Sequence, residues 1–446
     1  MVIEDGSSSR SRTKLIQKIV LGVGFLVQGL RCFPWMAVNF FLKDALNVEP
    51  STLQILQNTV NLPMVVKPLY GIISDTFYVG GQHRIPYIAF GALLQALSWL
   101  SIAILNPSDI TVISMYLLLS NIGASITEVA NDAMVAELGK QQTTSSKKKP
   151  RSSTSGELQS FVWMVSSAGG VIGNLLGGMA TGRTSSHAMF MFFGILLAIQ
   201  FLVTISFHES CLNLPQSSTK VGMKKQFSDL ASALKRPEMA YAITWFAASY
   251  AVIPTLTGTM FFYQTQYLKI DTTVLGLSKV FGQGMMLLWS VVYNRGLKSI
   301  PPRKLISTIQ IVMAAFMLSD VLFVKGIYRE IGLPNSIYVV VFSGFLEVLF
   351  FFKILPFSVL IAELCPPGCE GSIMAFLMSV VAFAFILSGY LGVLLASMVG
   401  VTGQNFSGLP VGIFVQAVAT LLPLFWSYWI PTSTSLLTPT IRIKDE

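Results

Sequence analysis

The stretch SNIGASITEVANDAMVAE, residues 120–137, is long and apolar enough to form one helix, yet it carries two acids near its middle. A helix turns by about 100° per residue, so four polar side chains of this stretch fall on one narrow stripe. They are Asn121, Ser125, Glu128 and Asp132. On a soluble helix such a stripe would face water, so its meaning depends on whether this helix meets water at all.

The composition of the whole chain indicates that most of it lies in lipid. The 446 residues are 53% hydrophobic and 11% charged, with a mean hydropathy of +0.65, whereas a soluble domain has about 25% charged residues. The net charge of +9 is concentrated in loops, and we expect no nucleic-acid partner. No phosphate-binding loop, zinc-protease motif or nucleophile–base pair is present, so we expect neither an enzyme nor a bound metal or other cofactor.

Twelve segments are candidates for membrane crossing, because a spanning helix needs about 20 mostly apolar residues. They are residues 19–42, 52–74, 86–105, 111–137, 157–182, 187–207, 239–264, 272–294, 304–324, 336–363, 371–399 and 409–430. The pattern predicts an all-α membrane protein with 12 transmembrane helices in two six-helix halves. The expected parts are a tail (1–18), a first half (19–207), a linker (208–238), a second half (239–430) and a tail (431–446).

The distribution of basic residues predicts the orientation in the membrane. Of the 30 Lys and Arg residues, 21 lie in segments on the side that holds the N-terminus, and five lie on the opposite side. This bias places both tails and the linker in the cytosol. A weak internal repeat, with MVAEL at 134–138 similar to VLIAEL at 359–364, favours an alternating-access carrier over a channel.

Basic residues inside the spans are hypotheses about function, because each costs roughly 2.5–3.5 kcal/mol on insertion scales. Arg31 lies close to Pro34, which would open the first span; Arg31 is either a substrate ligand or part of a structural ion pair. Lys67 in the second span can bind substrate or extend toward the cytosolic edge. Lys353 precedes Pro356 in another interrupted span.

The two acids of the opening stretch are one helical turn apart, so Glu128 and Asp132 cannot both ionise cheaply in a low dielectric. Three roles stay open for them: carrying a proton, accepting hydrogen bonds from an amino-heterocycle, or only neutralising Arg31 or Lys67. Glu137 lies at the membrane edge, where it would cap or latch. In the fifth span, Gly169, Gly173 and Gly177 predict a close contact with another helix.

Six stretches of this chain resemble the folate–biopterin transporter family of the major facilitator superfamily, most closely its plant branch. They are FLVQGLRCFPWMAVNFFLKD (25–44), NLPMVVKPLYGIISD (61–75), GGQHRIPY (80–87), SNIGASITEVANDAMVAE (120–137), SGELQS (155–160) and FKILPFSVLIAELCPPGCEGSIMAFLMS (352–379). The likeness extends over both halves. It implies a twelve-span carrier for folates or related pterins that is coupled to protons, lies in a lipid bilayer and acts as a monomer.

The resemblance also suggests roles for individual residues. Substrates of the family combine a flat pterin with a glutamate tail that has two carboxylates. We expect the tail to be bound by Arg31, Lys67 and Lys353. The candidates for accepting the pterin N–H groups are Glu128 and Asp132, which are also the candidates for proton coupling, and the candidates for stacking are Trp35 and Tyr70. Gating residues on the cytosolic side, as in the superfamily, are expected to be Asp75, Arg84 and Glu137.

The sequence indicates less about the membrane and the substrate than about the fold. The first residues include Glu4 and Asp5 and are short and acidic for a chloroplast presequence, so we expect the plasma membrane or an endomembrane rather than the plastid envelope. Two other functions stay open: a facilitator carrier for another organic anion, and a transport-inactive membrane sensor or scaffold. The charges inside the spans argue against the scaffold, which has no reason to bear their cost.

Overall fold

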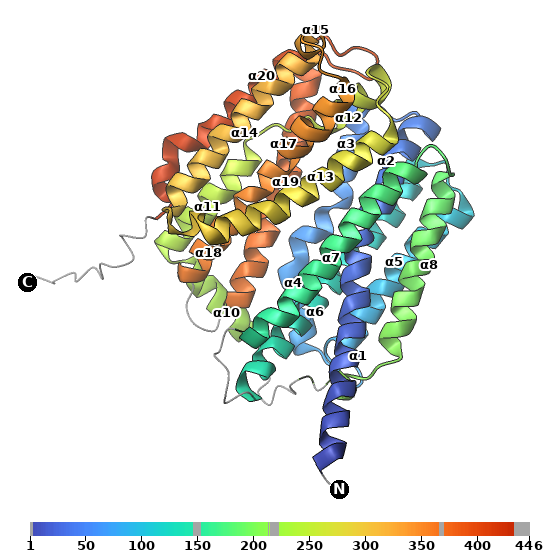
Figure 1. Ribbon diagram of the computed structural model, residues 1–446, viewed down its shortest axis with the longest axis vertical. Helices are drawn as coiled ribbons and strands as arrows, with labels where there is room; N and C mark the ends of the chain where they lie inside the picture. The colour runs from blue at the N-terminus through green and yellow to red at the C-terminus, as the bar shows by residue number, and fades with distance from the viewer. Residues whose placement is uncertain (1–2, 146–152, 213, 215–222, 365–369, 432–446) are drawn as a thin grey trace, which may run out of the picture. The chain divides into compact units, whose positions relative to one another are not determined.

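The computed structural model describes residues 3–145, 153–212, 214, 223–364 and 370–431, and these residues form helices and short connections without any β-strand (Figure 1). The expected C-terminal tail lies almost entirely outside the described residues, as do residues 213 and 215–222 of the expected linker. The predicted all-α class is confirmed for the part that is described.

The chain divides into two compact units. Unit 1 consists of Met1–Phe227 and Ile270–Val280, and unit 2 of Ser228–Lys269 and Phe281–Glu446. Helix α13 therefore begins in unit 1 and ends in unit 2, as helix α10 also does.

The elements of unit 1 follow the first six predicted spans. They are α1 (Ile3–Leu30), α2 (Cys32–Phe40), the π-helical turn η1 (Phe41–Ala45), α3 (Pro50–Val60), the 3₁₀ helix η2 (Leu62–Val66), α4 (Lys67–Thr76), α5 (Ile85–Leu105), α6 (Ile110–Ser145), α7 (Ser153–Ala180), α8 (Ser186–Ile205) and α9 (Glu209–Leu212). The start of α13 (Thr272–Arg295) completes the unit.

The elements of unit 2 follow the later spans. They are α11 (Pro237–Ala251), α12 (Thr257–Phe262), the π-helical η3 (Tyr263–Tyr267), the rest of α13, the 3₁₀ turn η4 (Leu297–Ser299), α14 (Pro302–Val324), α15 (Ile327–Glu330), α16 (Asn335–Tyr338), the π-helical η5 (Val339–Ser343), α17 (Gly344–Phe352), α18 (Ile354–Leu364), α19 (Glu370–Met398), α20 (Leu409–Leu421) and the 3₁₀ helix η6 (Leu422–Trp429). Helix α10 (Met223–Leu234) joins the two units along the chain.

Ten helical stretches of the described residues are long and apolar enough to cross a membrane. The two remaining predicted spans, 52–74 and 239–264, are interrupted rather than continuous. The first consists of α3, η2 and α4, with Pro63 and Pro68 near the breaks. Proline has no backbone N–H and clashes with the preceding turn, so a continuous helix cannot pass through these positions. The second is interrupted between Ala251 and Thr257, a segment that contains Pro254.

Small residues bring α1 and α2 close to α7. A Cβ atom on Gly169 would lie 2.6 Å from the backbone oxygen of Leu26, and one on Gly173 would lie 3.2 Å from the Cα of Leu30. The predicted glycine contact is therefore confirmed, and it fixes the end of α1 against α7. Helix α1 ends at this contact, and Arg31 is the first residue after it.

Candidate functional site

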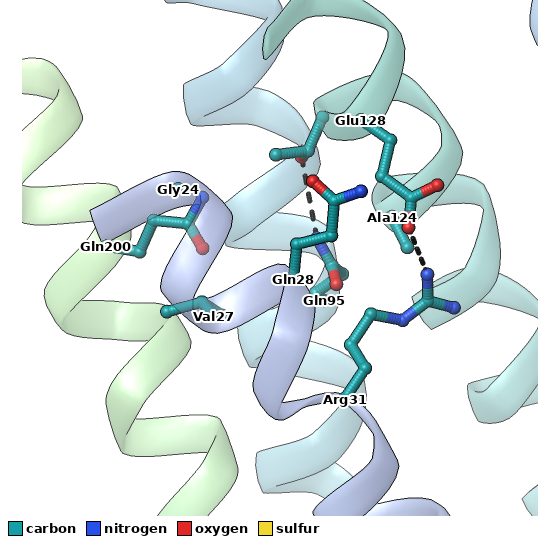
Figure 2. Close-up of a pocket in the computed structure, with 9 residues that line it drawn as sticks. Gly24, Val27, Gln28, Arg31, Gln95, Ala124, Glu128 and Gln200 are labelled. Carbon is teal, nitrogen blue, oxygen red and sulfur yellow. Dashed lines mark hydrogen bonds and ion pairs between the residues drawn. The ribbon is translucent and has the colours of Figure 1, made fainter. Parts of the chain in front are cut away.

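Arg31 occupies the junction between two helices. Helix α1 ends at Leu30 and α2 begins at Cys32, and the Arg31 N–H donates to the Gln28 oxygen three residues back at 3.4 Å. Pro34 in the next turn cannot donate a hydrogen bond to the preceding helix, so the chain bends here. The bend directs the guanidinium of Arg31 toward α6, as Figure 2 shows.

One carboxylate of α6 binds two cations. Arg31 Nη1 makes a short contact with Glu128 Oε1, and Lys67 Nζ lies 2.6 Å from Glu128 Oε2. The side chains of Arg31 and Lys67 remain 20% and 25% exposed, whereas that of Glu128 is 11% exposed. The structure therefore brings together three of the predicted residues: Glu128 pairs with both Arg31 and Lys67, and one positive charge is left over.

Most of the polar stripe of α6 is used to hold the interrupted second span. Asn121 Nδ2 donates to the Val60 oxygen at 2.6 Å and to Asn61 Oδ1 at 3.1 Å, and its own Oδ1 accepts from Arg31 Nη2 at 2.9 Å. The Val60 oxygen ends α3, where the intrahelical hydrogen bonds stop. Ser125 is buried as well and donates to the Asn121 oxygen at 2.8 Å.

Asp132 differs from the rest of the stripe because its side chain is exposed. The ion pairs of the described residues do not include it. One turn of helix separates it from Glu128. The two acids of the opening stretch thus occupy different environments, one enclosed by cations and one open.

A small cavity, called the hollow below, borders the contact of Arg31 with Glu128. It is bordered by Gly24, Val27, Gln28, Arg31, Gln95, Ala124, Thr127, Glu128 and Gln200 (Figure 2). Its volume of about 10 Å³ is room for roughly one water molecule and far too little for a pterin ring. Two buried atoms on its border, Gln28 Oε1 and Gln200 Nε2, have no hydrogen-bond partner among the described residues, so the hollow suits one small polar molecule.

The three residues predicted to gate the carrier form a second ion cluster in unit 1. Arg84 Nη2 lies 2.5 Å from both Asp75 Oδ1 and Glu137 Oε1, and Arg84 Nη1 donates to Ser74 Oγ at 2.6 Å. Asp75 comes from α4, Glu137 from α6, and Arg84 immediately precedes α5. The cluster therefore ties three helices together through one guanidinium.

Sequence reasoning missed the continuation of this cluster through His83 and Glu209. Glu209 begins α9 and accepts backbone N–H donors from His83 at 2.9 Å, from Ile85 at 2.9 Å and, in a short contact, from Arg84. The carboxylate therefore lies at the N-terminus of α5, where the free N–H groups and the helix dipole favour an anion. The only sequence signal was an acid directly after the sixth span.

The ring of His83 connects the two acids, with Nδ1 3.1 Å from Glu209 Oε2 and Nε2 3.3 Å from Glu137 Oε2. Burial alone would lower the pKa of His83, but its hydrogen bonds to Glu137 and Glu209 raise that pKa to about 9. Burial opposes ionisation of Glu209, yet hydrogen bonds from His83 and from the backbone of Arg84 and Ile85 lower its pKa to about 2. The imidazolium then donates to both carboxylates.

The remaining predicted ligands are not part of the ion pairs that join Glu128 to Arg31 and Lys67, called the Glu128 cluster below. Lys353 is 0% exposed in unit 2, where its Nζ donates to Gln310 Oε1 at 2.7 Å and to Ser249 Oγ at 3.1 Å and lies 3.9 Å from the centre of the Tyr250 ring. Two aromatic candidates belong to unit 1. Trp35 meets Trp99 edge to face with ring centres 6.4 Å apart, and Tyr70 is partly exposed on α4.

The helices that the structure describes, with their apolar spans, interruptions and ion clusters, have the architecture of a multi-pass membrane protein with the major facilitator fold. Solved structures support this fold. A nucleoside transporter, NupG, matches with a TM-score of 0.65 and 14% identity over 94% of this chain and 98% of its own. A D-xylose–proton symporter matches with a TM-score of 0.64 and 14% identity over 94% and 98%.

The chain belongs to the BT1 family, whose model matches residues 28–440. It is 58% identical to the probable folate-biopterin transporter 7 of Arabidopsis thaliana over 95% of this chain and 94% of that one. It is 43% identical to the chloroplastic probable folate-biopterin transporter 9 of the same plant, over 97% and 79%. Folate transporter 1 of Plasmodium falciparum is 24% identical over 94% and 80%. The chain is therefore a transporter and not an enzyme, and the resemblance seen in the sequence is confirmed.

Proposed function

We propose that this chain moves folates or related pterins across a membrane by alternating access, as a proton symporter. One observation carries the proposal: two partly exposed cations, Arg31 and Lys67, share the single carboxylate of Glu128. The surplus positive charge suits the carboxylates of a folate tail, which charge-assisted hydrogen bonds would hold. The names of the relatives, which include folate and biopterin, support the same class of substrate.

Asp132 supplies the connection between proton and substrate in this proposal. Asp132 lies one helical turn from the Glu128 cluster. With Asp132 ionised, the four side chains carry no net charge; with Asp132 protonated, one positive charge is unmatched. A protonated Asp132 therefore favours binding of an anionic substrate, which is the coupling that a symporter needs. Both oxygens of Glu128 already accept from cations, so Glu128 is the second candidate for carrying the proton and for accepting a pterin N–H, after Asp132.

The aromatic candidates would hold the flat rings of the substrate. Tyr70 is three residues after Lys67 on α4, so the two side chains lie on one face of that helix. Trp35 lies four residues after Arg31 along the chain. Stacking on such rings contributes about 0.5–1.5 kcal/mol beyond burial of their surface.

Lys353 is the candidate ligand from unit 2. It forms no ion pair with a carboxylate among the described residues, so a substrate carboxylate would be its first anionic partner there. Its burial requires that unit 2 open locally before such contact. The cluster of Asp75, Arg84 and Glu137 would close and open the cytosolic side by forming and breaking its ion pairs.

The membrane and assembly state complete the proposal. We place the carrier in the plasma membrane or an endomembrane, acting as a monomer in the lipid bilayer. A fluorescent fusion in plant cells tests the location, and coincidence with a plastid envelope marker would contradict it.

Uptake of labelled folate, methotrexate and biopterin by cells expressing the full chain tests the function. Uptake should exceed that of cells expressing an Arg31→Ala/Lys67→Ala double variant and should match that of Lys43→Ala, which removes a cation paired with Asp44 at 2.8 Å outside the Glu128 cluster. Correct membrane insertion without uptake of any of the three compounds would refute the proposal.

The same surplus charge would serve a carrier for another organic anion, which is the second candidate. Competition by unlabelled dicarboxylates and amino-acid conjugates separates the two, because a folate carrier should be inhibited by antifolates at far lower concentration. A sensor or scaffold would show no flux of any of these compounds.

A further inference from the structure

Unit 2 contains a buried acid that lies outside the proposed binding and gating residues. Asp320 of α14 is 6% exposed and lies four residues before that helix ends at Val324. It forms no ion pair among the described residues. An aspartate inside a membrane span is expensive, and a functional role is its default interpretation.

Three hydroxyl groups connect this carboxyl to a loop. Tyr338 donates its hydroxyl hydrogen to Asp320 Oδ1 at 3.0 Å, and the same hydroxyl lies 2.8 Å from Ser319 Oγ. Ser319 Oγ in turn lies 3.0 Å from the hydroxyl of Tyr328. Tyr338 is fully buried, whereas Tyr328 of α15 is partly exposed in the loop that follows α14. The chain of hydroxyls therefore runs from the surface to the carboxyl.

Apolar rings enclose the inner end of this path. The ring of Tyr338 stacks on Phe323 with centres 4.1 Å apart and an angle of 7°, and on Phe342 with centres 4.9 Å apart and an angle of 9°. Tyr328 lies against Tyr338 as well, with ring centres 4.8 Å apart. Stacking of this kind fixes the rings, and with them the hydroxyl groups, in position.

Few charged or titratable groups belong to the elements that pack against α14, and α20 carries none. The groups are Arg303 and Lys304 at the far end of α14, Lys325 directly after it, Tyr263 in η3, Tyr328, Arg329 and Glu330 in α15, Tyr338 in α16, Glu347 in α17, Glu363 near the end of α18 and Tyr428 in η6. Arg329 and Glu330 are exposed, and Arg329 Nε donates to Asn335 Oδ1 at 3.1 Å. The group in direct hydrogen-bond contact with Asp320 is the hydroxyl of Tyr338.

We propose that Asp320 is a proton-binding site, and that protons reach it through Tyr328, Ser319 and Tyr338 from the side of loop 325–334. The charge bias of the sequence predicts that this side is opposite the cytosol. The inference rests on the proton coupling in the proposed function, and it adds a site in unit 2 to the Glu128 cluster of unit 1.

In this proton transfer, every O–H bond that breaks is matched by one that forms. Solvent gives a proton to the Tyr328 oxygen, whose own proton passes to Ser319 Oγ; the proton of Ser319 passes to the Tyr338 oxygen, and that of Tyr338 to Asp320 Oδ1. Each oxygen in the chain loses one O–H bond and gains one, so the hydroxyls end neutral and reversed in direction. The net result is one proton removed from solvent and one O–H bond formed on Asp320.

Protonation has a mechanical consequence at Tyr338. This residue ends α16 and is followed directly by the π-helical turn η5, and such wide turns often mark functional positions. A protonated Asp320 donates toward Tyr338 instead of accepting from it, which reverses the contact that holds the start of this span. Lys353 belongs to the same helical stretch, Asn335–Ile361. A change in the hydrogen bond at the start of this stretch can therefore shift the position of Lys353, the candidate substrate ligand.

Purified full-length protein in liposomes tests the inference. Two rates are measured for each variant: uptake of labelled folate or biopterin driven by a pH gradient, and exchange of the same compound without a gradient. In Asp320→Asn, driven uptake should fall by about tenfold or more while exchange changes by less than about twofold. Tyr338→Phe and Ser319→Ala should also slow driven uptake, and the control Tyr428→Phe, an exposed tyrosine of the same unit, should not.

Unchanged driven uptake in Asp320→Asn, or equal loss of driven uptake and exchange, would overturn the inference. Infrared difference spectroscopy of the substrate-free protein is a second, independent test of the site. The wild-type protein should show a pH-sensitive C=O band of a protonated carboxyl that disappears in Asp320→Asn; a band unaffected by the substitution overturns the site. Because this band does not depend on substrate, a protein that transports no folate or pterin refutes the proposed function alone.

Discussion

Replacing Arg31 by alanine should separate folate from biopterin. The substitution removes the guanidinium that contacts Glu128 Oε1 and donates to Asn121 Oδ1 at 2.9 Å. Lys67 stays 2.6 Å from Glu128 Oε2, so the carboxylate keeps one cation and the cluster becomes less positive without leaving an isolated buried charge. The fold should therefore survive the change, and the effect should appear in substrate binding.

The size of the effect follows from the interaction that is lost. A hydrogen bond to a charged group contributes about 1.5–3 kcal/mol, and about 1.4 kcal/mol corresponds to a tenfold change in affinity. The KM for folate should rise by roughly 10- to 100-fold. Biopterin has no glutamate tail, so its KM should change by less than about threefold.

Initial rates of uptake of the two labelled compounds, normalised to the amount of protein in the membrane, measure this difference. Arg31→Lys should fall between wild type and Arg31→Ala, because lysine keeps the charge and loses the planar fork. Lys43→Ala serves as the control for loss of one positive charge elsewhere in unit 1. If folate and biopterin uptake fall by the same factor, Arg31 is a structural ion-pair partner and the reasoning fails.

Three further predictions concern other parts of unit 1. Asp132→Asn should reduce proton-driven uptake more than exchange, since its exposed carboxyl is the proposed proton carrier; equal reduction of both rates would assign it to structure or substrate contact. The contact of Glu209 with the start of α5 should be intact near pH 6.5, weaken as His83 loses its proton toward pH 9, and weaken again as Glu209 is protonated toward pH 2. Hydrogen exchange at the backbone amides of residues 83–85, corrected for intrinsic rates, measures this, and a flat profile from pH 6.5 to 9 would count against it. Gly29→Ala should destabilise the protein in a thermal unfolding assay by about 1–3 kcal/mol, because its Cβ would collide with the backbone of α7, whereas Gly284→Ala meets no atom within 4 Å and should be neutral; equal stability of the two variants would contradict the helix contact.

The charged residues of the Glu128 cluster could be identified from sequence because a charge inside an apolar span is visible in one dimension. The sequence did not show which acid forms ion pairs with these cations. Arg31 is separated from Glu128 by 97 positions and Lys67 by 61, and the two acids one turn apart were equally good partners for both cations. The bends at Arg31 and before Lys67 direct both side chains to Glu128 and leave Asp132 exposed.

Two acids, Asp320 and Glu209, were not predicted. Asp320 lies near the end of a span and Glu209 just beyond one, and at such positions the sequence does not distinguish an enclosed acid from an exposed one. Only the packing of Tyr338 onto α14 encloses Asp320, and only the position of α9 presents Glu209 to the start of α5. The breaks in the second and seventh spans were not predicted either, because hydropathy averages over them, although Pro63, Pro68 and Pro254 lie there.

The sequence by itself determined that this chain is a two-half membrane transporter, and it identified most of the charges within its spans. Hydropathy and charge bias are local properties, and the bilayer acts on each segment in turn, so one dimension is enough for them. The tertiary structure decided where the second and seventh spans are interrupted, which acid is enclosed by cations and which hydroxyls reach Asp320. These depend on distances between residues remote in sequence, where a few ångströms separate a stabilised ion from an isolated one.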